Sequence, residues 1–164
     1  EVLSEDMLFA TLDPTSRRLR LPREREIIIT DTVGFIRDLP PDLVRAFEAT
    51  LEELQDADLL LHVVDATNVG LEDHIDTVTR VLEQLDLDNR PCLLVLNKTD
   101  QLTDEEIHNL EQLHDGIGIS ALAPQTLKPL LARITPRCPP FRPDPHTPGV
   151  PTNTPRLGLG RAGR

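Results

Sequence analysis

Residues 92–100 are CLLVLNKTD, an apolar stretch that ends abruptly in the polar residues Asn97, Lys98, Thr99 and Asp100. A short segment that is apolar at nearly every position is typical of a strand buried on both faces of a parallel sheet. Ligands of such sheets bind outside the carboxyl ends of the strands. The four polar residues are therefore candidates for a binding site.

Further apolar strands alternate with amphipathic helices along the chain. Strands are predicted at 17–21, 26–32, 59–66, 92–98 and 116–120, the first two as a hairpin. Helices are predicted at 40–54, 71–85, 103–113 and 124–134, the third of them opened by a capping box of Thr103 and Glu106. This alternation predicts an α/β fold, a mostly parallel sheet with helices on both faces.

Composition divides the chain into two segments. Residues 1–134 are predicted to form one globular domain. Residues 135–164 hold eight of the 15 prolines, four of the eight glycines and almost no large apolar side chains. Such a segment buries too little apolar surface to order itself, so we expect a disordered tail.

Charge and composition exclude several function classes. The net charge is −11, and the acidic excess lies in residues 1–134, because residues 135–164 hold five arginines and one aspartate. An acidic surface without Trp or Tyr argues against a DNA-binding or single-strand-binding protein. No apolar stretch approaches about 18 residues, so we expect a cytoplasmic chain without a membrane span. Cys92 and Cys138 share no zinc-like or disulfide-like spacing and are expected to be free thiols.

A first polar cluster, Asp31-Thr32-Val33-Gly34, ends the predicted strand at 26–32. A carboxylate at such a position can hold a magnesium ion through water, and the glycine lets its backbone N–H approach a terminal phosphate. A D-x-x-G sequence occurs often by chance, so a plain turn after the strand is the alternative interpretation.

The cluster Asn97-Lys98-Thr99-Asp100 is more specific. The Asp100 carboxylate can accept hydrogen bonds from the ring N–H and the exocyclic amine of guanine, whereas adenine offers neither donor there. Asn97 would tie the loop to its neighbours, and the Lys98 stem would lie along the purine. Ser120-Ala121-Leu122 follows the last strand, where small residues let backbone N–H groups reach the guanine carbonyl.

By contrast, Asp65 and His62 in the strand at 59–66 are predicted to have structural roles. Asp65 is expected to be a loop-capping carboxylate, and His62 a strand histidine.

The order D-x-x-G, N-K-x-D, S-A on successive strand ends resembles the translation-factor-like P-loop GTPases. A narrower resemblance is to the HflX family of ribosome-associated GTPases. It is carried by three stretches, LFATLDPTSRRLRLP, DTVGFIRDLPPDLVRAFEATLEEL and ADLLLHVVDAT. The resemblance implies GTP or GDP as ligand, Mg²⁺ as cofactor and the large ribosomal subunit as partner. It also implies that Thr11, with Thr15 as second candidate, and Asp31 contact the metal. Phe35 stands where many GTPases carry the glutamine that orients the attacking water, so intrinsic hydrolysis is expected to be slow.

One departure from the family pattern concerns the phosphate-binding loop. No G-x-x-x-x-G-K-[ST] sequence occurs in the 164 residues, and the strand that precedes this loop in the family is missing with it. Gly158, Gly160 and Gly163 have no lysine near them and are not expected to form such a phosphate-binding loop. We therefore expect the strands at 26–32 and 59–66 to face a gap or to close on each other, and the isolated chain to lack cooperative unfolding and GTP hydrolysis. The alternative to a GTPase is a non-catalytic fragment or interaction module that binds nucleotide weakly or not at all.

Overall fold

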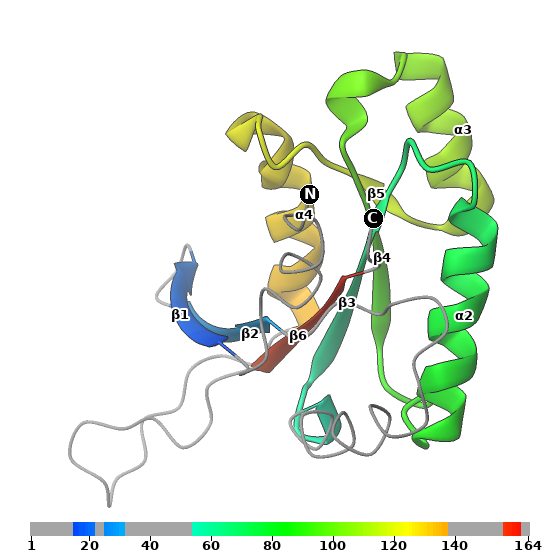
Figure 1. Ribbon diagram of the computed structural model, residues 1–164. Coiled ribbons are helices and arrows are strands. Elements are labelled where there is room, and N and C mark those ends of the chain that lie inside the picture. The colour runs from blue at the N-terminus through cyan, green and yellow to red at the C-terminus, as the bar shows by residue number, and fades with distance from the viewer. Residues whose placement is uncertain (1–14, 22–24, 32–53, 138–155, 162–164) are drawn as a thin grey trace, which may run out of the picture.

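The computed structural model describes residues 15–21, 25–31, 54–137 and 156–161 (Figure 1). Within these ranges it forms a six-stranded sheet with helices on both faces, which confirms the predicted α/β fold. The strands are β1 (Thr15–Leu21), β2 (Arg25–Asp31), β3 (Leu59–Asp65), β4 (Cys92–Asn97), β5 (Ile117–Gly118) and β6 (Arg156–Arg161). The helices are α2 (Leu71–Gln84), α3 (Asp104–His114) and α4 (Leu127–Ile134).

The order of strands in the sheet is β1-β2-β6-β3-β4-β5. Strands β1 and β2 are antiparallel and form the predicted hairpin, in which Ser16 Oγ and Thr30 Oγ1 lie 2.9 Å apart. All other neighbours are parallel. Because β2, β6, β3, β4 and β5 run the same way, their carboxyl ends meet at one edge of the sheet.

Alternate residues of the strands pack into apolar clusters on both faces of the sheet. Leu59 and Leu61 of β3 pack with Leu130 and Ile134 of α4. Leu60 packs on the opposite face with Val78 of α2. Figure 1 shows this layering, with α2 and α3 on one side of the sheet and α4 on the other. A strand covered on both faces has apolar residues at successive positions, which is why β3 has no polar–apolar alternation.

The helix boundaries follow local sequence signals. The capping box is present, since Thr103 Oγ1 accepts from the Glu106 backbone N–H at 3.4 Å and the Glu106 carboxylate accepts from Thr103 N at 2.8 Å. The segment at 124–134 begins as a short 3₁₀ turn and becomes helical at Leu127. The predicted helix at 40–54 lies almost entirely outside the described residues. No helix within the described ranges is long and apolar enough to span a bilayer.

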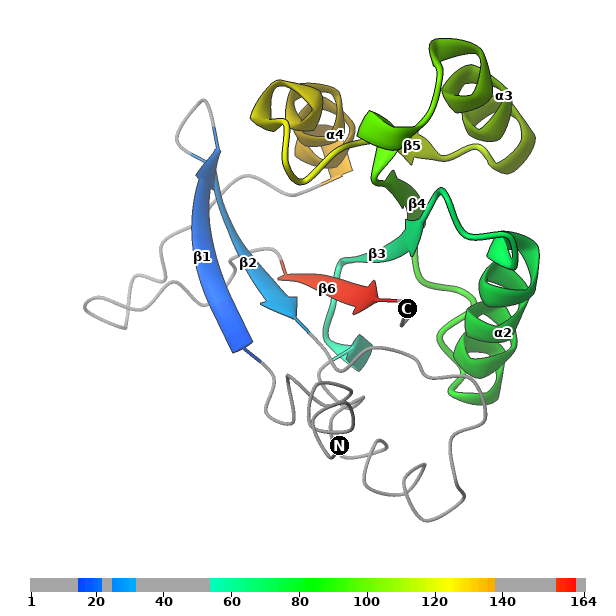
Figure 2. The same cartoon turned by 45° about the horizontal axis from the view of Figure 1, so that its top comes forward.

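The central position of the sheet is occupied by β6, which comes from the C-terminal segment (Figure 2). It pairs in parallel with β2, where Asp31 is opposite Leu159, and with β3, where Leu60 is opposite Gly158. Leu157 is fully buried in the core that α4 covers. The expectation that β2 and β3 face a gap or close on each other is therefore wrong, and residues 156–161 form a strand where a disordered tail was expected.

Two physical properties make this short segment fit. Its backbone N–H and C=O groups find partners on both sides, so that a strand with few large side chains still forms two ladders. Gly158 faces Leu54, and a Cβ built on it would lie 2.6 Å from Leu54 Cδ2 and 3.2 Å from Leu60 Cδ2. A glycine therefore fits at position 158, where the backbone of β6 lies close to the side chain of Leu54. With the central strand present, the expectation of non-cooperative unfolding loses its basis.

Candidate functional site

Three strands end in polar residues at the same edge of the sheet. Asp31 ends β2, Asp65 ends β3 and Asn97 ends β4. Asp65 and Asn97 are opposite each other in the register of β3 and β4, and the backbone N–H of Ala66 donates to Asn97 O at 2.9 Å. The parallel sheet therefore gathers residues that are more than 30 positions apart in sequence.

The loop after β4 is tied to the loop after β5. Asn97 Oδ1 accepts a hydrogen bond from the backbone N–H of Ala121 at 3.1 Å. Thr99 N donates to Ile119 O at 3.1 Å, and Ile119 N donates to Leu96 O at 2.8 Å. The predicted tying role of Asn97 is thus present in the geometry, and the two loops form one unit.

Asp100 is oriented by a residue of the second loop. Ser120 Oγ donates to Asp100 Oδ1 at 2.5 Å, and the same hydroxyl accepts from Leu122 N at 3.2 Å. Ser120 is almost fully buried, whereas Asp100 is exposed. An ionised carboxylate has about four lone-pair sites, so a single hydroxyl donor leaves capacity for two further donors from a ligand.

Thr126, which no sequence motif marks as a site residue, contacts the backbone of the Ser120 loop. Its Oγ1 accepts from Ser120 N at 2.9 Å and lies 2.7 Å from Ala123 O, to which it can donate. The available signal was a threonine that closes the turn A-P-Q-T shortly after Ser120. Such a residue is a common partner for a loop backbone, but its target cannot be read from the sequence.

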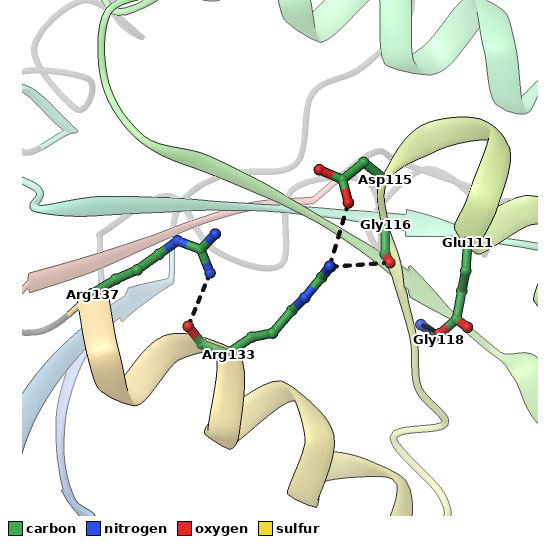
Figure 3. Close-up of polar contacts among 6 residues, drawn as sticks. All are labelled: Glu111, Asp115, Gly116, Gly118, Arg133 and Arg137. Carbon is green, nitrogen blue, oxygen red and sulfur yellow. Dashed lines mark hydrogen bonds and ion pairs between the residues drawn. The ribbon is translucent and has the colours of Figure 1, made fainter.

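A second set of contacts fixes β5, from which the Ser120 loop departs (Figure 3). Glu111 Oε1 accepts from Gly118 N at 2.7 Å, and Arg133 donates to Gly116 O and to Asp115 Oδ1, both at 3.3 Å. Arg137 donates to Arg133 O at 3.0 Å. Glu111 of α3 thus holds Gly118 of β5, and Arg133 of α4 holds the two residues that precede the strand.

Lys98 has an unusual backbone conformation and a charged partner. Its φ of 69° and ψ of 29° lie in the left-handed region, which non-glycine residues seldom adopt. Its Nζ lies 2.6 Å from Asp65 Oδ2. Asp65 Oδ1 accepts from Thr67 N at 3.0 Å and from Thr67 Oγ1 at 2.7 Å. Asp65 therefore caps its loop as predicted, but it also contacts Lys98 in the loop after β4, which the sequence does not predict.

The side chain of Asp31 has a buried oxygen at the end of β2. Asp31 Oδ1 has no hydrogen bond within the part of the chain that the structure describes. No cluster of three or more His, Cys, Asp or Glu side chains occurs in those same ranges. A buried carboxylate oxygen with free lone pairs fits a hard cation such as Mg²⁺, directly or through its water shell. Thr11, Thr32, Val33, Gly34 and Phe35 lie outside the described residues, as does the side chain of Thr15.

His62 lies away from this edge, on the face of β3 that α2 covers. Its side chain is buried beside a small apolar cavity with Leu54, Val78 and Cys92, and its Nε2 has no partner among the described residues. Burial, with a smaller contribution from the charge of His74, lowers the pKa of His62 to about 4. A neutral, buried imidazole is consistent with the structural role predicted for it.

The arrangement of strand ends and loops has a counterpart among known proteins. Residues 1–98 match the model of a family described as "50S ribosome-binding GTPase". The chain belongs to this GTPase family. The family match covers the D-x-x-G residues and Asn97 and Lys98, and it confirms the resemblance noted from the sequence.

Individual relatives place the chain with the HflX members of the family. It is 48% identical over 134 residues to the GTPase HflX of Alkalihalophilus pseudofirmus, covering 82% of this chain and 31% of that protein. It is 53% identical over 105 residues to the GTPase HflX of Escherichia coli, covering 64% of this chain and 25% of that protein. The chain thus spans less than a third of the length of these relatives.

A solved structure shares the fold as well. A crystal structure of an SsGBP variant superposes with a TM-score of 0.62 and 31% identity, covering 73% of this chain and 46% of that chain. This similarity agrees with the α/β sheet of the GTPase family.

Proposed function

We propose that the loops after β4 and β5 form a guanine-binding site, and that the chain is the base-recognising part of an HflX-like GTPase that hydrolyses GTP to GDP. The observation that carries the proposal is the contact of Ser120 Oγ with Asp100 Oδ1 at 2.5 Å. It joins the two motifs on which guanine recognition depends and fixes the direction of the carboxylate.

The chemistry of the site favours guanine over adenine. Guanine presents a ring N–H and an exocyclic amine side by side, and the oriented Asp100 carboxylate can accept from both. Adenine would place an acceptor nitrogen against the carboxylate and leave it unpaired, which discriminates by several kcal/mol in comparable sites. Thr99 at the loop turn is buried, and the N–H of Ala121 already bonds to Asn97, so both strand-end loops are fixed before a base arrives.

Mg²⁺ is the proposed cofactor, and Asp31 with Thr11 are the proposed residues at the metal. The Asp31 oxygen that has no hydrogen bond to any described residue supports this assignment. When bound, the ion would neutralise charge on the phosphates. Thr32, Val33 and Gly34 are proposed to approach the γ-phosphate through their backbone.

The proposed partner is the large ribosomal subunit, and the proposed location is the cytoplasm. The description of the matching family supports the partner. Because the chain spans less than a third of its HflX relatives, ribosome association is proposed for the complete form of the protein.

A second candidate function is guanine recognition without hydrolysis. It concerns the 164 residues taken by themselves, among which no G-x-x-x-x-G-K-[ST] sequence occurs; in P-loop GTPases that loop supplies most contacts to the β- and γ-phosphates. Single-turnover incubation of the chain with GTP and Mg²⁺ separates the two candidates. Release of phosphate above the buffer rate indicates a GTPase, and binding of GDP without release indicates a recognition module.

The base specificity is tested with Asp100→Asn. An amide can donate to the 2-oxo group of xanthine, so the variant should lose affinity for GDP and gain it for XDP, each by about tenfold or more. Nuclear magnetic resonance titration with GDP, ADP and XDP measures the three affinities, and Asp76→Asn on the exposed face of α2 serves as the matched control. Equal binding of GDP and ADP by the unmodified chain would refute the proposed function.

A further inference from the structure

Lys98 is constrained at both ends of its side chain. Its backbone is in the left-handed conformation, with φ 69°, and its ammonium group lies 2.6 Å from Asp65 Oδ2. A non-glycine residue in this region is strained and persists when its surroundings fix it. The four-carbon stem between these two points therefore has far fewer conformations than the stem of a surface lysine.

The Asp65 side chain is also fixed by contacts other than the ion pair with Lys98. It is the last residue of β3, opposite Asn97 in the register with β4. Thr67 donates twice to Asp65 Oδ1, at 3.0 Å from the backbone N–H and 2.7 Å from the hydroxyl. This leaves Oδ2 directed to Lys98. Burial alone would raise the pKa of Asp65, but the hydrogen bonds from Lys98 and Thr67 outweigh it and lower that pKa.

The ion pair has a consequence for ligand binding. The sequence motif predicts that the stem of Lys98 lies along the purine ring of a base held by Asp100. A free lysine would lose most of its rotamer freedom when a base stacked on it, and this loss would weaken binding. A lysine already anchored by Asp65 loses little, because the stem is ordered before the base arrives.

We infer that Asp65 is a positioning residue of the guanine site, which orders the Lys98 side chain against the purine through the ion pair at the ends of β3 and β4. The inference rests on the proposed function. Asp65 does not touch the nucleotide in this arrangement; it acts through Lys98. Its effect on affinity must therefore vanish when Lys98 can no longer form the pair.

A double-mutant cycle tests this dependence. Asp65→Asn keeps an acceptor for Thr67 but removes the charge, and Lys98→Met keeps an apolar stem but removes the ammonium. GDP affinity is measured by titration of the full chain, of both single variants and of the double variant. We expect Asp65→Asn to raise the Kd about tenfold in the original chain and less than about twofold in the Lys98→Met background. Asp76→Asn, on the exposed face of α2, should leave the Kd unchanged.

The outcomes separate the inference from the function beneath it. An equal loss of affinity in both backgrounds would show that Asp65 has a general structural role and would overturn the inference, as would unchanged affinity in Asp65→Asn. If the unmodified chain shows no preference for GDP over ADP, the proposed function fails, and the inference fails with it. Thermal melting of each variant identifies a change in affinity that is caused by unfolding.

Discussion

Ser120 Oγ lies 2.5 Å from Asp100 Oδ1, although the two residues are 20 positions apart and belong to different loops. The contact depends on the parallel pairing of β4 with β5, which brings Leu96 opposite Gly118. It is short because the acceptor is a carboxylate, and hydrogen bonds to charged acceptors are stronger than neutral ones. The pairing of β4 with β5 and the Ser120 hydroxyl thus set the direction of the Asp100 carboxylate.

Replacing Ser120 by alanine tests this contact. Ser120→Ala removes the donor and leaves Asp100 free to rotate, so we expect GDP affinity to fall about three- to tenfold, with a smaller effect on ADP. The measurement is a titration with both nucleotides. Ser120→Thr keeps the hydroxyl and is the control. Unchanged discrimination in Ser120→Ala would mean that Asp100 needs no partner to hold its orientation.

The central position of β6 predicts a large stability effect at Leu157. Leu157→Ala would leave a cavity in the core beneath α4, so we expect the free energy of unfolding to fall by about 2–5 kcal/mol. Leu19→Ala, at an exposed position of β1, should change it by less than about 0.5 kcal/mol. Urea unfolding of the full chain measures both. Equal, negligible effects would show that the C-terminal strand does not occupy the sheet in solution.

Gly158 gives an independent test of the same strand. Gly158→Val would place its side chain against Leu54 and Leu60, both of which are buried, so we expect a loss of about 1–3 kcal/mol from overpacking. Leu54→Ala should recover part of this loss in the double variant, because it removes the methyl group nearest to the new Cβ. A valine that raises stability would indicate that position 158 is more open than the structure shows.

His62 predicts a dependence of stability on pH. Its pKa is about 4 in the folded chain against 6.5 for an ordinary histidine, because burial disfavours the cation. The unfolded chain therefore binds more protons between pH 6.5 and 4, and this group's contribution is complete above pH 6.5 and lost as the pH falls toward 4. Between pH 6.5 and 4, the free energy of unfolding should change less steeply with pH in His62→Leu than in the original chain, by up to about 1.4 kcal/mol per pH unit. Denaturant titrations at several pH values measure it, and identical slopes would contradict the assignment.

Asp31 predicts a dependence on magnesium. Asp31→Asn keeps the size of the side chain and removes the charge that would hold the cation, so we expect the Mg²⁺-dependent part of GTP affinity to fall at least about tenfold. GDP affinity without magnesium should stay within about twofold, because the base site lies on other loops. Titrations with and without Mg²⁺ measure the difference. An equal loss under both conditions would point to a structural role for Asp31 at the end of β2.

The sequence determined those parts of the protein in which a local pattern has one physical solution. Apolar stretches bounded by polar residues gave β3 and β4 within one residue of their observed ends. Thr103 and Glu106 marked the start of α3, because the capping box satisfies donors within a single turn. The sequence is also enough to predict that Asn97, Asp100 and Ser120 lie close together, since the carboxyl ends of parallel strands meet at one edge of a sheet.

The tertiary structure decided what depends on pairing between distant segments. Residues 156–161 have two leucines and two glycines, and the alternation in RLGLGR is too short to distinguish a strand from a tail. They lie between β2 and β3 because the facing backbone groups of these two strands need hydrogen-bond partners, and because only a small residue fits next to Leu54. Neither condition can be read from the sequence. The pairing of Asp65 with Lys98 likewise needs the register of β3 against β4, because it joins two loops whose separation the sequence leaves open.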